Sequence, residues 1–173
     1  LGWDNRFTSA GYMASSDVMN TQPELVVNGG TLSASGIIYV SYHGSLGSTN
    51  RFILNSGTVS ARAFYYGESA SPASAAVVEI NGGSLLLQED FRVARYLAES
   101  WLYLNGGVLR AFDIQKAGGD GNAYIFLNGG TFQPIAYPNT SAWNSDYGTL
   151  QNLSNVWVQA GGFILDTSLC PTG

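Results

Sequence analysis

The stretch Leu127-Asn128-Gly129-Gly130 repeats Leu104-Asn105-Gly106-Gly107, and close variants of it recur along the chain. The related tetrapeptides are VNGG at 27–30, LNSG at 54–57, INGG at 80–83 and QAGG at 159–162. Aligned on the asparagine, with Ala160 as a degenerate sixth member, successive motifs are 27, 26, 24, 23 and 32 residues apart. Such recurrence is typical of a repeat architecture, in which one structural unit stacks on the next.

The asparagines and glycines of these motifs are predicted to form the turns of the repeat. Glycine adopts positive φ without strain and lets the next coil approach closely. Asparagine side chains stacked about 4.8 Å apart can hydrogen-bond in a ladder along the axis. The predicted turn residues are Asn28, Gly29, Gly30, Asn55, Gly57, Asn81, Gly82, Gly83, Asn105, Gly106, Gly107, Asn128, Gly129, Gly130, Gly161 and Gly162.

The residues around each turn alternate with period two. In the five motifs that contain asparagine, the positions one and three residues before it are apolar, and the position between them is mixed. After the glycines an apolar residue recurs, and a third apolar and aromatic stretch follows at 37–40, 63–66 and 91–93. This pattern predicts a strand, a bend and further strands that share one buried face.

A single unit of about 24 residues cannot bury its inward face alone, but parallel stacking buries it against its neighbours. We therefore predict an all-β, single-stranded parallel β-helix (β-solenoid) of about six coils, right-handed by the usual preference of parallel crossovers. The solenoid is expected to span 25–167, with a long loop insertion at 133–155. Residues 1–24 are expected to form a cap or arm, and 168–173 a tail. An antiparallel sheet with hairpin turns is the alternative.

Composition excludes several classes of partner. Only 11% of the 173 residues are charged, the net charge is −5, and the seven basic residues are scattered, so we expect no nucleic-acid partner. No apolar run approaches the roughly 18–20 residues of a membrane span. Cys170 is the only cysteine; an unpaired thiol and an intermolecular link both remain open.

The sequence shows no convincing catalytic set, and we expect no enzyme, cofactor or metal. The single histidine, His43, lies in a predicted loop, where a solvated side chain is the simpler interpretation. The carboxylates do not recur at equivalent outward positions, as a polysaccharide lyase or hydrolase would need. The loop 118–122 holds one copy of a pattern that binds calcium only in tandem. Asn139 and Asn152 match the glycosylation acceptor pattern, whose use is left open.

Outward aromatic residues are the candidate contact surface. Tyr103 and Phe126 share one offset from their asparagines, and Trp101 and Tyr124 share the offset two residues earlier. Trp143, in the long loop, is added to this set. Such a strip can stack sugar rings or bury against another subunit, and packing beneath a loop is the alternative.

The segment from Ile37 to Phe112, together with Gly29-Gly30-Thr31-Leu32, resembles the autotransporter-associated β-strand repeat of large bacterial surface and secreted proteins. The ending at 149–168 resembles the recurrent end of that repeat, where a Gly-Gly strand runs into an Asp-Thr pair. The resemblance implies a parallel β-helix, an extracellular or cell-surface location, and a structural or adhesive role. With the open ends of a solenoid, it leads us to expect a non-enzymatic structural module that self-associates end to end into fibres or filaments, with itself or neighbouring repeats as partner. A carbohydrate-binding or adhesive module is the second hypothesis.

Overall fold

The structure, a computed structural model, describes residues 24–41, 47, 49–67, 74–94, 99–116, 118–136, 150–153 and 155–170. All strand pairs in these residues are parallel, and these residues contain no helix. The prediction of an all-β parallel β-solenoid is therefore confirmed, and the antiparallel alternative is wrong for this part of the chain. The right-handed sense and the count of about six coils stay predictions. The expected cap at 1–24 lies, except for Glu24, outside the described residues.

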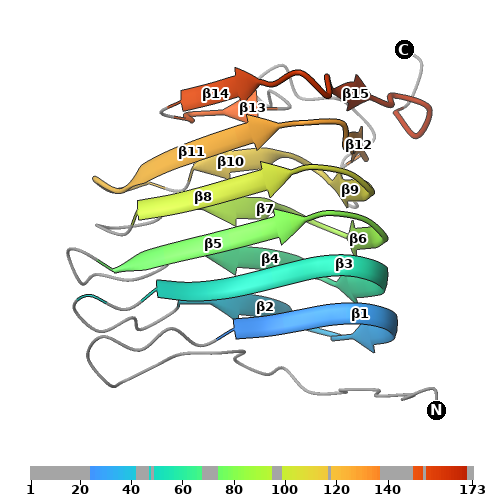
Figure 1. The fold of residues 1–173 in the computed structure, drawn as a ribbon, viewed down its shortest axis with the longest axis horizontal. Coiled ribbons are helices and arrows are strands. Elements are labelled where there is room, and N and C mark those ends of the chain that lie inside the picture. Colours follow the sequence, from blue (N-terminus) through green and yellow to red (C-terminus); the bar gives the residue numbers. More distant parts are fainter. Residues whose placement is uncertain are drawn as a thin grey trace.

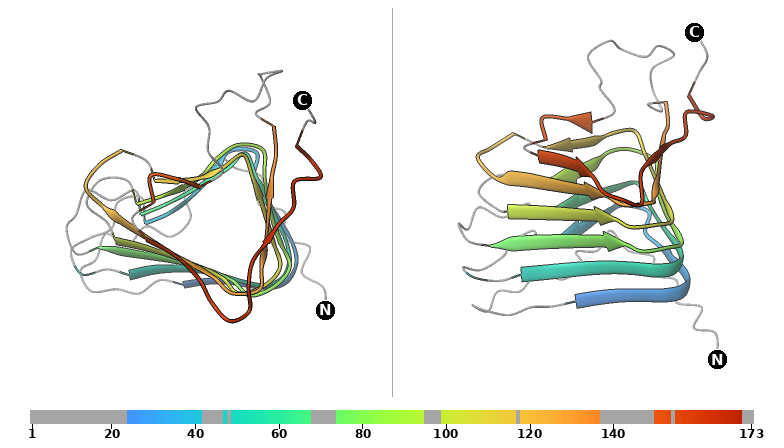
Figure 2. Two further views of the ribbon diagram at one scale, coloured as in Figure 1. Left: turned by 90° about the horizontal axis from the view of Figure 1, so that it is seen from above. Right: turned by 45° about the horizontal axis from the view of Figure 1, so that its top comes forward.

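The coils stack along one axis, and their strands line up into three faces (Figure 1). Seen along that axis, the coils superimpose in a three-sided outline (Figure 2). The first face holds β1 (Glu24–Ser33), β3 (Thr49–Ala61), β5 (Ala75–Ile80), β8 (Glu99–Leu104), β11 (Asn122–Leu127) and β14 (Asn155–Val158). β1 and β3 bend at the turn and continue into the second face, beside β6 (Ser84–Leu87), β9 (Val108–Ala111), β12 (Thr131–Pro134) and β15 (Ile164–Leu165). The third face holds β2 (Ile37–Val40), β4 (Ala63–Tyr66), β7 (Phe91–Val93), β10 (Ile114–Lys116) and β13 (Leu150–Gln151).

The core fills the space enclosed by the three faces, and its residues are those that the period-two pattern predicts. The inward positions before and after the turns are buried in β3, β5, β6, β8, β9, β11 and β12. On the third face, Phe64 stacks on Phe91 of the next coil, with ring centroids 5.4 Å apart. Phe52 reaches the same cluster from the first face, 5.1 Å from the ring of Phe64. Each internal unit therefore buries its inward face against the coils above and below, as stacking requires.

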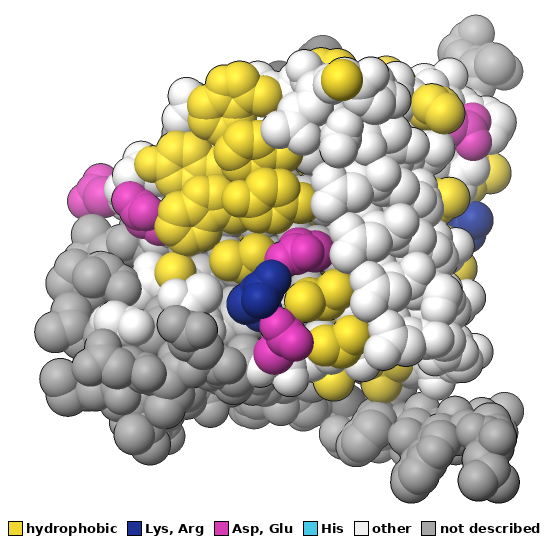
Figure 3. All heavy atoms as spheres, in the orientation of Figure 1, with side chains coloured by type: hydrophobic (Ala, Val, Ile, Leu, Met, Phe, Trp, Pro, Cys, Tyr) yellow, Lys and Arg dark blue, Asp and Glu magenta, His cyan; other side chains and the backbone are white. Residues whose placement is uncertain are grey.

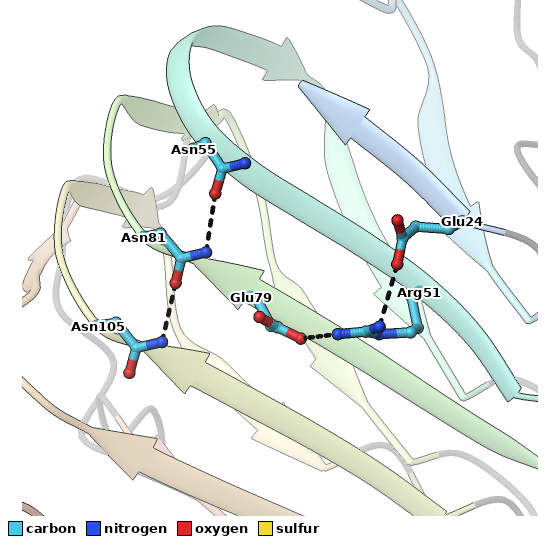
Figure 4. A network of polar contacts seen from close by, with 6 residues as sticks. All are labelled: Glu24, Arg51, Asn55, Glu79, Asn81 and Asn105. Atoms are coloured by element: carbon cyan, nitrogen blue, oxygen red, sulfur yellow. Dashed lines mark hydrogen bonds and ion pairs between the residues drawn. The ribbon is translucent and has the colours of Figure 1, made fainter. Parts of the chain in front are cut away.

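The predicted asparagine ladder is present over four coils. Asn55 Nδ2 donates to Asn28 Oδ1 at 2.8 Å, and Asn81 Nδ2 donates to Asn55 Oδ1 at 2.9 Å. Asn105 Nδ2 extends the ladder to Asn81 Oδ1 at 2.9 Å (Figure 4). Within the described residues the ladder stops at Asn105, and in the next turn Asn128 Oδ1 accepts a hydrogen bond from the backbone N–H of Gly161 at 2.9 Å. The turn thus changes its bonding pattern one coil before the C-terminal end.

At the turn that contains Gly107, glycine is required by both backbone angle and space. Gly107 has φ +67°, a conformation that residues with a Cβ rarely adopt. A Cβ at this position would lie 2.6 Å from the carbonyl oxygen of Gly83 on the preceding coil. In the motif at 128–130 the positive φ moves to the first glycine, Gly129, with φ +101°. The second glycine, Gly130, is not among the residues with positive φ.

The last turn corrects the alignment on Ala160. β14 pairs with β11 so that Val158 lies opposite Leu127, which places Gln159 at the position of Asn128. Gln159 N–H donates to Leu127 O at 2.8 Å, as Asn128 N–H donates to Leu104 O at 2.8 Å. From Asn128 to Thr131 is three residues, whereas from Gln159 to its counterpart Ile164 is five. This last turn therefore holds two additional residues. The range 133–155, expected as a loop insertion, contains strand β13.

Candidate functional site

The outward side chains of the first face lie in columns, with one residue from each coil. One column runs Val26, Ile53, Glu79, Tyr103, Phe126 and Trp157. The adjacent column runs Glu24, Arg51, Val77, Trp101, Tyr124 and Asn155. Both columns change from aliphatic and charged residues on β1, β3 and β5 to aromatic residues on β8 and β11. Figure 3 shows this change as a hydrophobic area beside a small group of charged side chains.

Five rings form what we call the aromatic patch: Trp101, Tyr103, Tyr124, Phe126 and Trp157. Trp101 stacks on Tyr124 with centroids 5.5 Å apart and planes 16° apart. Tyr103 stacks on Phe126 at 4.8 Å and 8°. Trp157 covers both columns from the next coil, 4.8 Å from Phe126 and 6.2 Å from Tyr124. The prediction that the outward aromatics of β8 and β11 lie together is therefore confirmed, because the parallel register aligns them.

Trp157 is the patch residue that the sequence analysis missed. The alignment on Ala160 placed Trp157 three residues before the turn, which is an inward position. The true register is shifted by one residue, and such a shift exchanges the two faces of a strand. Trp157 therefore points outward, with 42% of its surface exposed. Trp143, the remaining predicted contact residue, lies outside the described residues.

Next to the aromatic patch, three charged side chains from three coils meet. Arg51 Nη1 lies 3.1 Å from Glu24 Oε2 on the preceding coil. Arg51 Nη2 donates a hydrogen bond to Glu79 Oε1 on the following coil (Figure 4). The hydrogen bond to Glu79 raises the pKa of Arg51, against the effect of partial burial. This pairing could not be predicted from the sequence, because it depends on the register between β1, β3 and β5.

A shallow hollow of about 380 Å³ joins the ion pair to the aromatic patch. It is lined by Thr49, Arg51, Val77, Glu79, Trp101, Tyr103 and Asn105. The hollow therefore combines two aromatic rings with a cation, a carboxylate and two neutral polar side chains. Asn105 is also the last member of the asparagine ladder, and within the described residues no donor reaches its Oδ1 from the next coil. A surface of this mixed composition suits a ligand that has both apolar and hydroxyl-bearing faces.

A second polar group lies at the corner between the second and third faces. Asp90 and Asp113 precede Phe91 and Ile114, which pair with one another, so the two carboxyls occupy equivalent positions on adjacent coils. Asp90 accepts from Arg92 Nε at 3.0 Å and from Nη2 at 2.8 Å. Burial, and then repulsion from Asp90, raise the pKa of Asp113 to about 7. This pair is not evident from the sequence, because the two residues stand at different distances from their asparagines.

The other predicted features are placed as follows. His43 and Asn139 lie outside the described residues, while Asn152 is exposed with φ +54°. Cys170 is half-buried, with Sγ 3.6 Å from Pro134 O, and burial raises the pKa of its thiol. Across the described ranges, no three His, Cys, Asp or Glu side chains come together as a metal site. Those ranges also contain no helix long and apolar enough to cross a membrane.

Comparison of the chain with protein families, with curated proteins and with solved structures found no match in any of the three.

Proposed function

We propose that this chain is a non-enzymatic structural module of an extracellular bacterial surface protein, which associates end to end through its stacked coils. The observation that carries the proposal is the exposure of inward residues on the C-terminal coil. Val158 and Leu165 stand opposite the buried residues Leu127 and Phe132, yet they are 65% and 49% exposed. Val156, opposite the buried Ile125, is 39% exposed.

These residues follow the core pattern, but no described coil covers them. In the lower coils the same positions gain their burial from a neighbour on each side. Their exposure therefore leaves apolar surface in water, and burying it against another coil is favourable by about 25 cal/mol per Å². β14 and β15 are also edge strands among the described residues, so one side of each backbone lacks a β-ladder partner.

The proposed occupant of this edge is the N-terminal coil of a second copy, or of a neighbouring repeat in a longer chain. Among the described strands β1 pairs with β3 alone, and it has the same parallel direction as the rest of the first face. Placing β1 on β14 continues the parallel ladder and repeats the stacking that already joins the coils. Such a head-to-tail contact generates an open filament, unless the rotation between successive copies closes a ring. The low charge fraction and the resemblance to the autotransporter-associated β-strand repeat support this assignment and the proposed extracellular location.

Sedimentation velocity across a concentration series tests the proposal. We expect the wild-type chain to form species whose mass rises with concentration. Val158→Lys places a charge at the open edge and should keep the chain monomeric, because a buried unpaired charge opposes stacking. Gly118→Lys adds the same charge where a new Cβ meets no atom within 4 Å, and it should associate like the wild type. A wild-type chain that stays monomeric at every concentration would contradict end-to-end association.

A further inference from the structure

We propose that the hollow beside the aromatic patch is a binding site for a neutral polysaccharide. Both aromatic columns end at β8, beside the hollow. Trp101 and Tyr103 are covered on one side by Tyr124 and Phe126. On the other side their counterparts are Val77 and Glu79, so no ring continues either column below β8. These two rings are the ones that line the hollow.

The lining of the hollow combines apolar rings with hydrogen-bond acceptors, which suits a sugar. A pyranose ring has a C–H face that packs on an aromatic side chain and a rim of hydroxyl groups that donate and accept hydrogen bonds. Trp101 and Tyr103 supply the apolar surface. Glu79 uses Oε1 for Arg51, and a carboxylate accepts at about four sites, so it can also accept from sugar hydroxyls. Asn105 Oδ1, at the end of the ladder, provides another acceptor.

The charge of the site selects a neutral ligand. Arg51 is the only cation among the lining residues, and it is already paired with Glu24 and Glu79. The negative charge of a uronic acid or a sulfated sugar would be repelled by the carboxylate of Glu79, and the lining offers no unpaired cation to neutralise it. The chain as a whole carries a net charge of −5, which also disfavours an acidic polymer. A neutral hexose or pentose polymer avoids both costs.

The position of the hollow on the solenoid leaves it open to a long polymer. The hollow lies on the outer surface of β3, β5 and β8, and it is open on the side away from the core. The first face contains one strand from each coil, so end-to-end association would place a copy of the hollow on the first face of each successive module. Sugar binding at the hollow does not depend on that association, because all its lining residues come from one chain.

Isothermal titration calorimetry with the full 173-residue chain tests the site. The probes are cellohexaose, mannohexaose and laminarihexaose as neutral oligosaccharides, with polygalacturonate oligomers as the acidic comparison. We expect saturable binding of at least one neutral hexasaccharide with a Kd below about 1 mM, and weaker binding of the acidic oligomer. Trp101→Ala should weaken that binding by about tenfold, because it removes one of the two rings that line the hollow.

Two further variants distinguish loss of the hollow from loss of a ring elsewhere in the patch. Glu79→Gln keeps the shape of the side chain and should weaken binding by about fivefold, because a neutral acceptor forms weaker hydrogen bonds. Trp157→Ala removes a ring at the far end of the same patch, away from the hollow, and should leave the Kd within about twofold of the wild type. Circular dichroism confirms that each variant retains its strands.

Several results would overturn the assignment. These are no saturable binding of any of the three neutral probes, preference for polygalacturonate, or equal losses for Trp101→Ala and Trp157→Ala. A Trp101→Ala chain with altered sedimentation mass would show that a second copy occupies the patch instead. The monomeric Val158→Lys variant should bind sugar like the wild type, so failure of the sugar site and failure of end-to-end association are told apart.

Discussion

At the residue scale, asparagine contributes to the turns through its side chain as well as through its backbone preferences. The internal members of the ladder, Asn55 and Asn81, both donate and accept, so the hydrogen bonds run along the axis and tie one coil to the next. The sequence predicted this, because asparagine recurs at the same point of five of the six motifs. It could not predict that Asn128 bonds to the backbone of Gly161, since that contact depends on the two additional residues of the last turn.

Removal of an internal member of the ladder should cost more than removal of a terminal one. Asn81→Ala deletes one bond to Asn55 and one from Asn105, so we expect the free energy of unfolding to fall by about 1–2 kcal/mol. Asn28→Ala deletes a single bond and should cost about half as much. Urea denaturation followed by circular dichroism measures both. Equal or negligible effects would show that the ladder adds no stability.

Asp113 should make the stability of the fold depend on pH near neutrality. Its pKa is raised from 3.8 to about 7, chiefly by burial and then by Asp90, while Arg92 and Gln115 act in the opposite direction. Gln151 also faces it, with Nε2 3.4 Å from Asp113 Oδ2. Because the folded pKa is the higher one, the contribution to stability is fully present below about pH 4 and is lost as the pH rises through about 7.

The corresponding measurement compares thermal unfolding at pH 5 and pH 8 in the wild type and in Asp113→Asn. Lowering the pH to 5 should stabilise the wild type by about 2 kcal/mol through this group. Asp113→Asn removes the titration, so it should be more stable than the wild type at pH 8 and show a smaller difference between the two pH values. An unchanged difference in the variant would mean that other carboxyls control the pH response.

At the scale of the strand, the inward residues were predictable and the neighbours across coils were only partly so. Period-two alternation located the buried positions of β3, β5, β8 and β11, because each strand buries one face. The aromatic pairs of β8 and β11 followed from equal distances to their asparagines. Trp157 and the pair Asp90–Asp113 did not follow, because additional residues between motifs change those distances and only the observed register aligns them.

Trp157 should hold β14 against β11. Its ring stacks on Phe126 at 4.8 Å and on Tyr124 at 6.2 Å, and these contacts supplement a ladder of only four residues. In Trp157→Ala we expect the amides of β14 to exchange with solvent at least about tenfold faster, because the edge strand loses its outward packing. Asn155→Ala changes the same strand without removing a ring. Hydrogen exchange read by mass spectrometry should show faster exchange in β14 and unchanged protection in β8; faster exchange throughout would contradict a local role.

At the scale of the whole molecule, the two ends of the solenoid differ. On the N-terminal coil the inward residues Val27 and Leu32 are each 9% exposed, whereas Val158 and Leu165 on the C-terminal coil are 65% and 49% exposed. The larger open apolar surface is therefore at the C-terminal end, and it is the surface that drives the proposed association. The outer surface of the first face stays available beside it, because the aromatic patch and the hollow point away from the stacking direction.

Cryo-electron microscopy of the purified chain across a concentration series tests the central claim most directly. If the coils of one copy continue those of the next, filaments will form at high concentration. Their axial repeat per subunit will be a whole number of spacings of about 4.8 Å, the distance between paired strands. Particles that stay single at the highest concentration, or that stop at pairs joined through their C-terminal coils, would contradict head-to-tail stacking.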